Sequence, residues 1–154
     1  RNEGKQLNEG IVQDYRYDYL CIEPKIVWAP SVFFEAEYKA TVSCVGGGIG
    51  EDTRLDPLWE VAQRLTLSLE FHDTEFCLSG EHFYNDLSKN QHLNTWLADV
   101  SLIHKAGKWR FAASAINLFN KEQYRYTLYS AVQSYTSWIK LRPREFMVSV
   151  QYQW

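Results

Sequence analysis

The chain has 154 residues, of which 45% are apolar and 16% aromatic, including six Trp, ten Tyr and eight Phe. That aromatic content excludes a disordered segment and is high for a small soluble domain. The net charge of -3 is spread along the chain without a basic stripe, so nucleic acid is excluded as a partner. No apolar run approaches the roughly 18 residues of a membrane-spanning helix.

Alternation of apolar and polar residues, the pattern of a β-strand, dominates the chain. It predicts seven strands, over residues 11–22, 30–45, 62–72, 75–86, 94–105, 109–127 and 136–154. Strands of globular proteins usually run about 5–6 residues, whereas a tilted strand that crosses a membrane needs about 9–11. The predicted lengths therefore favour membrane-crossing strands.

The connections between these strands are expected to alternate in length. Short links are predicted around Pro24, at Asp73-Thr74 and at Ala106-Gly107-Lys108, and longer connections at 46–61, 87–93 and 128–135. Outer-membrane barrels have tight periplasmic turns and long extracellular loops. The sequence thus predicts an antiparallel transmembrane β-barrel segment, with the 46–61 loop extracellular.

Alternation also predicts which side chains face the barrel lumen and which face lipid. The side chains expected to face the lumen are Glu35, Glu37, Lys39, Asp99, Ser149, Gln151 and Gln153. Those of the last strand expected to face lipid are Phe146, Val148, Val150, Tyr152 and Trp154. The six tryptophans, expected near strand ends as girdles at the lipid–water boundary, are Trp28, Trp59, Trp96, Trp109, Trp138 and Trp154.

Seven strands do not make a complete bacterial barrel, because single-chain barrels have even strand numbers from about eight upward. Open edges cannot persist in lipid, where every backbone polar group needs a partner. We therefore expect residues 1–154 to be the C-terminal part of a barrel domain, with strands 11–22 and 144–154 pairing with strands from elsewhere rather than with each other.

A family resemblance supports this interpretation near the C-terminus. The segment Asn117-Leu118-Phe119-Asn120-Lys121, followed by Tyr124, resembles the N-L-F-(D/N)-K-x-Y signature of TonB-dependent receptors, which lies on their penultimate strand. Here the tyrosine comes one residue later than in the shortest form of the motif. The tail Leu141-Arg142-Pro143-Arg144-Glu145-Phe146, which runs to a terminal Trp154, resembles the last strand of Bacteroidota members and the signal that the barrel-assembly machinery reads. Asp99 is similar to a position of the family's antepenultimate strand.

The resemblance implies a 22-stranded barrel in the bacterial outer membrane, which imports a bulky nutrient such as a glycan, siderophore, peptide or vitamin. Members carry an N-terminal plug domain and a segment that engages TonB, and neither is visible in this sequence. Two alternatives stay open: an outer-membrane adhesin or scaffold completed by another chain, and a soluble ligand-binding β-barrel with an aromatic interior.

The sequence contains little that indicates a catalytic, cofactor-binding or metal-binding site. The Gly46–Gly50 segment lacks the spacing of a dinucleotide-binding loop, and Cys77 stands where a nucleophile elbow around Ser79 requires glycine. The histidines lack H-E-x-x-H spacing, and the three cysteines, which have no C-x-x-C spacing, are Cys21, Cys44 and Cys77. Glu35 and Glu37 lie about 7 Å apart by strand rise, but Lys39 on the same face favours a solvated lumen wall. We expect no catalytic residue, cofactor or metal ion.

Overall fold

The computed structural model describes residues 2–8, 11–49, 53–88, 91–129 and 134–154. The strands within these ranges are β1 Asn2–Asn8, β2 Ile11–Ile22, β3 Lys25–Ser31, β4 Phe34–Ile49, β5 Thr53–Phe71, β6 Thr74–Ser88, β7 Gln91–Ala106, β8 Trp109–Ile116, β9 Gln123–Tyr129, β10 Ser134–Lys140 and β11 Glu145–Tyr152. The chain is therefore all-β, as the sequence predicts. No helix in the described ranges has the length and apolar character needed to cross a membrane.

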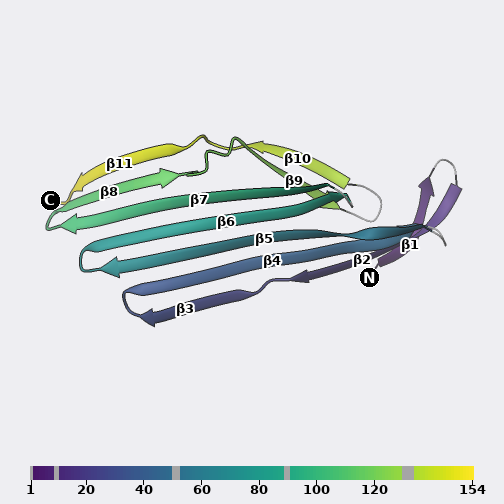
Figure 1. Cartoon of the computed structure of the whole chain (residues 1–154), viewed down its shortest axis with the longest axis horizontal. Coiled ribbons are helices and arrows are strands. Elements are labelled where there is room, and N and C mark those ends of the chain that lie inside the picture. Colours follow the sequence, from purple (N-terminus) through teal and green to yellow (C-terminus); the bar gives the residue numbers. More distant parts are fainter. Residues whose placement is uncertain (1, 9–10, 50–52, 89–90, 130–133) are drawn as a thin grey trace.

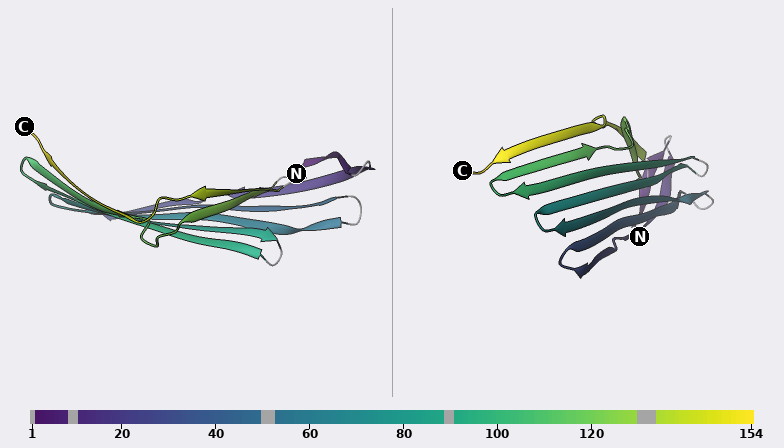
Figure 2. Two further views of the ribbon diagram at one scale, coloured as in Figure 1. Left: turned by 90° about the horizontal axis from the view of Figure 1, so that it is seen from above. Right: turned by 60° about the vertical axis from the view of Figure 1, so that its left-hand side comes forward.

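The strands form one bent layer, shown in Figures 1 and 2. Its order is β1-β2-β4-β5-β6-β7-β8-β11, with β3 also paired to β4, and every pairing is antiparallel. β9 and β10 form a separate hairpin. The sheet is open in the described residues, because β1 and β11 lie at opposite edges and β2 does not pair with β11.

The chain between β2 and β3 is interrupted around Pro24 but does not reverse its direction. β2 and β3 lie end to end along β4, which pairs with β3 over its first residues and with β2 over its last. The predicted turn around Pro24 is therefore wrong, since the chain continues in the same direction. Proline lacks the N–H that a ladder needs, but its carbonyl oxygen accepts the N–H of Ala40 at 3.0 Å and keeps the interrupted strand attached.

The expected long loop at 46–61 is also wrong. β4 runs to Ile49 and β5 begins at Thr53, so most of the segment is strand. Gly47 allows β2 to come close here, because a Cβ atom at this position would lie 2.2 Å from the Arg16 carbonyl oxygen. The strands also occupy most of the predicted 87–93 connection and half of the predicted 128–135 connection. Residues 50–52, 89–90 and 130–133, which join them, lie outside the described residues.

Three tight turns lie together at the end of the sheet drawn at the left of Figure 1. Two of them, at 72–73 and 107–108, fall where the sequence predicts short links, and His72 (φ 52°) and Gly107 (φ 58°) adopt left-handed backbone conformations there. The third, at 32–33, interrupts the predicted strand 30–45. Alternation of side chains across 32–36 could not reveal this turn, because a two-residue turn hardly disturbs the pattern.

The strand register separates a polar face from an apolar face, because directly opposed residues point to the same side of a sheet. One row of opposed residues on the polar face is Glu35, Ser68, Cys77, Ser101, Ser114 and Met147. The adjacent row on the apolar face is Ala36, Leu67, Leu78, Val100, Ala115 and Phe146. The sheet thus has a sidedness that persists across six strands.

No second layer covers the apolar face in the described part of the chain. Ala40 and Ala115 are the buried apolar residues there, whereas Phe146 is 73% exposed and Val148 81% exposed. The β9–β10 hairpin stands on the other side, since Tyr124 of β9 contacts Phe83, a polar-face position, at 4.7 Å between ring centroids. Figure 2 shows the hairpin standing off the main sheet.

Candidate functional site

The candidate site is the turn that follows β8, together with the segment that leads into β11. The motif residues Asn117 and Asn120 lie in this turn and both have positive φ angles, of 53° and 52°. Asparagine enters the left-handed region more readily than most residues. A bond from the Asn120 N–H to the Asn117 carbonyl oxygen, at 2.8 Å, closes the turn.

Asn117 is the centre of this site. It is 6% exposed, and its backbone N–H donates to the Asp99 carboxylate of β7 at 2.7 Å. Its side-chain amide donates to the carbonyl oxygens of Lys121 at 2.8 Å and Arg142 at 2.7 Å, and its side-chain oxygen accepts the Lys121 N–H at 2.9 Å. Both amide protons and the amide oxygen are therefore satisfied, which buried polar groups require.

Asn120 holds the next part of the same segment. Its side-chain oxygen accepts the N–H of Arg144 at 3.0 Å, and the Leu141 N–H donates to the Glu122 carbonyl oxygen at 3.0 Å. Residues 141–144 are thereby fixed at three points directly before β11. We call Asp99, Asn117, Asn120 and the backbone of 141–144 the clamp. It fixes where β11 begins, and from there β11 pairs with β8 from Glu145–Ile116 to Tyr152–Trp109.

The clamp corrects two predictions. The segments 109–127 and 136–154 are not continuous strands, because the clamp interrupts each of them. Motif residues 117–121 lie in the turn after β8 rather than within a strand, because left-handed Asn117 and Asn120 cannot extend the ladder, whereas Tyr124 lies in β9. Leu118 keeps one bond to β7, from its N–H to the Ala98 carbonyl oxygen at 2.8 Å, while Phe119 is exposed.

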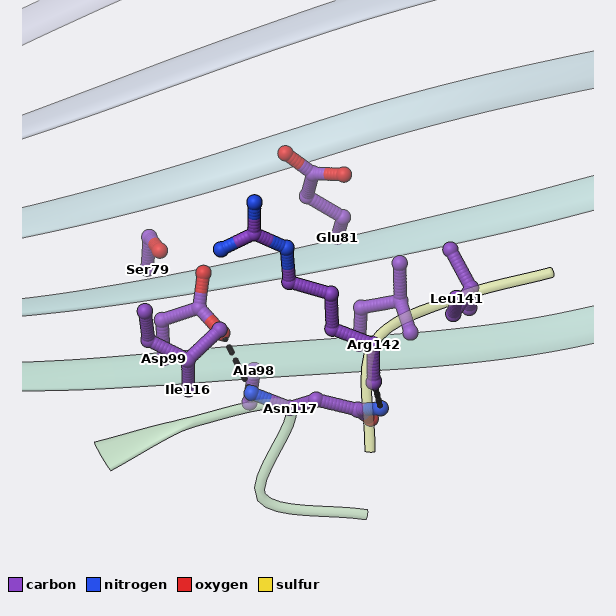
Figure 3. A pocket seen from close by; sticks show the side chains of 9 residues that line it. Ser79, Glu81, Ala98, Asp99, Ile116, Asn117, Leu141 and Arg142 are labelled. Atoms are coloured by element: carbon purple, nitrogen blue, oxygen red, sulfur yellow. Dashed lines mark hydrogen bonds between the residues drawn. The ribbon is translucent and has the colours of Figure 1, made fainter. Parts of the chain in front are cut away.

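A small pocket of about 140 Å³ opens beside the clamp on the polar face (Figure 3). The Arg142 side chain reaches into it between Glu81 and Asp99, and Leu97, Ile116 and Leu141 supply apolar walls. Glu81 forms an ion pair with Arg64 of β5. The alternation pattern indicated Asp99, whereas Arg142 was predicted within the strand 136–154 and instead comes from an irregular segment beside the pocket.

The residues predicted to face the lumen share the polar face. Glu35, Glu37 and Lys39 lie on it in β4, opposite Ser68, Thr66 and Arg64 of β5. The Glu37 carboxylate forms ion pairs with Lys25, at 3.0 Å, and with Lys39. Ser149 and Gln151 continue this face in β11, opposite Ala112 and Arg110. Gln153 follows the strand, and its N–H donates to the Lys108 carbonyl oxygen at 2.9 Å.

The side chains predicted to face lipid lie on the apolar face. Phe146, Val148, Val150 and Tyr152 alternate along β11 on that side, and Trp154 packs edge-on against Tyr152 at 5.6 Å between ring centroids. All six tryptophans are exposed, from 44% for Trp59 to 102% for Trp154. In the described ranges, no group of three or more His, Cys, Asp or Glu residues is placed to hold a metal ion.

Comparisons of the chain with protein-family models, with curated proteins and with solved structures gave no match.

Proposed function

We propose that the chain supplies strands of a transmembrane β-barrel in the bacterial outer membrane. The observation that carries the proposal is the uncovered apolar face of a single antiparallel layer whose other face is charged and polar. In water, such a face would need a second layer or a partner of similar area. In a membrane barrel the same face contacts lipid and the polar face lines the lumen.

Strand lengths and the asymmetry of the sheet support the same proposal. The central strands β4 to β7 have 15 to 19 residues, more than the roughly 9–11 needed to cross a bilayer. The tight turns at 32–33, 72–73 and 107–108 lie at one end of these strands. The strand length beyond that needed to cross the bilayer extends the sheet at the other end. Because periplasmic turns of such barrels are short and the extracellular side is longer, the tight-turn end is the periplasmic one in this proposal.

The open edges require further strands. β11 at one edge and β1 and β3 at the other carry backbone groups that would cost several kcal/mol each if left unpaired in hydrocarbon. In our proposal these edges pair with strands supplied from outside residues 1–154. A barrel assembled from several chains, acting as an adhesin or scaffold, would satisfy the same edges.

Within this class, we propose a TonB-dependent receptor that imports a bulky nutrient, with no enzymatic step. The support is the resemblance of the Asn117–Lys121 motif and of the tail to those of this family. The motif residues Asn117 and Asn120 also have a structural role, because they form the clamp. By fixing the start of β11, the clamp presents the terminal strand in one register to the barrel-assembly machinery. The plug and TonB would act through parts of the receptor outside residues 1–154.

Uptake by cells tests the receptor proposal. Cells with and without the gene would be compared for uptake of labelled glycans, siderophores, peptides and vitamins, with and without a protonophore. A TonB-dependent receptor predicts one solute class whose uptake requires both the gene and the proton gradient. An outer-membrane protein whose loss changes adhesion and leaves every uptake unchanged would favour the adhesin or scaffold.

A further inference from the structure

A continuous chain of hydrogen bonds crosses the apolar face over four adjacent strands. The Tyr38 hydroxyl of β4 donates to the Gln63 side-chain oxygen of β5 at 2.8 Å. The Gln63 amide nitrogen lies 2.8 Å from Nδ1 of His82 in β6, and Nε2 of His82 lies 2.9 Å from the Asn94 side-chain oxygen in β7. We call Tyr38, Gln63, His82 and Asn94 the polar ladder.

The donors and acceptors of the polar ladder can be paired consistently along its whole length. If neutral His82 carries its proton on Nε2, Nδ1 accepts from Gln63 and every donor in the ladder points the same way, from Tyr38 towards Asn94. Bonds aligned in this manner polarise and strengthen one another. Trp96 stacks on the His82 ring, with centroids 4.1 Å apart and planes inclined by 26°. The ladder is thus a built structure on a face that is otherwise largely apolar.

The apolar face has a different character on each side of the ladder. Between the ladder and the 72–73 turn, the large side chains that β5 and β6 present are Leu65, Leu67, Leu69, Phe71, Phe76 and Leu78. Beyond the ladder, the Tyr84 hydroxyl donates to Asp86 at 2.7 Å, and Asp86 also accepts the Trp59 N–H at 3.0 Å. Beyond the ladder, β6 and β7 therefore present the polar side chains of Tyr84, Asp86 and His92, whereas β4 and β5 present Val42, Val61 and Trp59.

The height of the ladder matches the thickness of a membrane. Gln63 stands nine residues before His72, and His82 stands nine residues after Asp73. Nine residues of strand rise about 30 Å. A tilt of about 35–45° leaves roughly 21–25 Å along the membrane normal, against the roughly 25 Å apolar band of outer-membrane barrels.

We propose that the polar ladder, with Trp96, marks the outer limit of the hydrocarbon on this face and contacts the lipid headgroup layer. This inference rests on the proposed function and specifies how far along the strands the hydrocarbon of the membrane extends. The Tyr38 backbone lies nearer the tight turns, and its hydroxyl reaches up to Gln63 as side chains with an apolar body and a polar tip do near an interface. Aromatic rings such as Trp96 favour the same level.

Depth measurements by spin labelling test the boundary. The complete native protein, with Cys21, Cys44 and Cys77 replaced by Ser, would be reconstituted in phospholipid vesicles with single nitroxide labels. Positions 61, 65, 67 and 84 sample the apolar face, and position 66 is the polar-face control. Accessibility to oxygen, which concentrates in hydrocarbon, is compared with accessibility to a water-soluble nickel chelate.

The ladder predicts oxygen-rich, nickel-poor labels at 65 and 67, and the reverse preference at 61 and 84. His82→Leu should move the boundary outward and raise the oxygen-to-nickel ratio at 61 at least twofold, whereas Thr66→Leu on the polar face should leave it unchanged.

Hydrocarbon that already extends past 61 and 84 in the protein with native His82 would overturn the inference alone. Equal nickel accessibility at 66 and 67 would contradict lipid contact and the proposed function with it. Labels at 65 and 67 shielded from both reagents would show a protein partner on this face and overturn the inference.

Discussion

The side-chain amide of Asn117 donates to the carbonyl oxygen of Arg142 at 2.7 Å and so joins the end of β8 to the segment that precedes β11. Twenty-five residues of chain, including the β9–β10 hairpin, separate these two positions. The bond allows the hairpin to leave the sheet while the two flanking strands remain paired.

Asn117→Ala should destabilise the protein through this junction. The substitution removes the side-chain hydrogen bonds to the Arg142 carbonyl oxygen and to the Lys121 backbone, and it places alanine in the left-handed region. Unsatisfied buried groups cost about 1–3 kcal/mol, and the backbone conformation adds about 1–2 kcal/mol. Unfolding of the complete protein in urea, followed by gel mobility of the folded form, measures the loss.

Asn117→Gly is the matched control, because glycine accepts the positive φ but lacks the amide. It should retain the cost of the lost hydrogen bonds and recover the conformational part. Equal stability of Asn117→Ala and the protein with native Asn117 would show that the clamp does not hold β11.

Val150→Arg should destabilise the protein by about 2–4 kcal/mol if position 150 lies near the bilayer midplane. The reason is that Val150 lies on the apolar face, opposite Phe111. Gln151→Arg is the neighbouring control on the polar face and should cost far less. The comparison is made by urea unfolding in lipid vesicles, and similar costs for the two variants would contradict the assignment of faces.

Sidedness is tested by epitope tags at the two ends of the sheet. A tag inserted within 50–52 should bind antibody on intact cells, and a tag at Gly107 should bind only after the outer membrane is opened. The expectation rests on the three tight turns at one end of the sheet and on the extra strand length at the other end. A tag at Gly107 that is detected on intact cells, together with a hidden tag within 50–52, would invert the topology.

The open edges predict that β2 and β11 have no direct contact in the folded protein. A variant lacking the native cysteines and carrying Tyr19→Cys and Ser149→Cys, two positions on the polar face, should form no disulfide within the chain under oxidation. The paired control, Ser114→Cys with Met147→Cys, joins directly opposed residues of β8 and β11 and should form one. A bond between positions 19 and 149 in a monomer would show a sealed barrel made from this chain alone.

Much of the strand pattern could be predicted from the sequence, because alternation reports which side chains share a face. β2 coincides with the predicted 11–22 strand, and the 72–73 turn was expected from Asp73-Thr74. The interruptions were missed for a physical reason: alternation describes side chains, whereas breaks at Pro24 and Asn117 depend on backbone N–H groups and φ angles. β1 and β3 were missed as well, and the expectation that strand 11–22 pairs with a strand from elsewhere is wrong over Ile11–Tyr17, which pairs with β1.

The candidate site could be predicted only in part. The resemblance indicated Asn117 and Asn120, but their partners Arg142 and Arg144 act through backbone groups that every residue possesses. The polar ladder had no signal either, because Tyr38, Gln63, His82 and Asn94 come together through the register of four strands. Such a register is set by pairing between distant segments rather than by any local pattern.

Cysteine scanning of β11 tests most directly whether the apolar face of the sheet lies against lipid. Single cysteines at positions 146 to 151, in the complete protein without its native cysteines, would be reacted in outer membranes with a membrane-impermeant thiol reagent. The account predicts weak labelling at 146, 148 and 150 and strong labelling at 149 and 151. Strong labelling of the 146, 148 and 150 set would contradict the claim that the apolar face of this sheet lies against lipid.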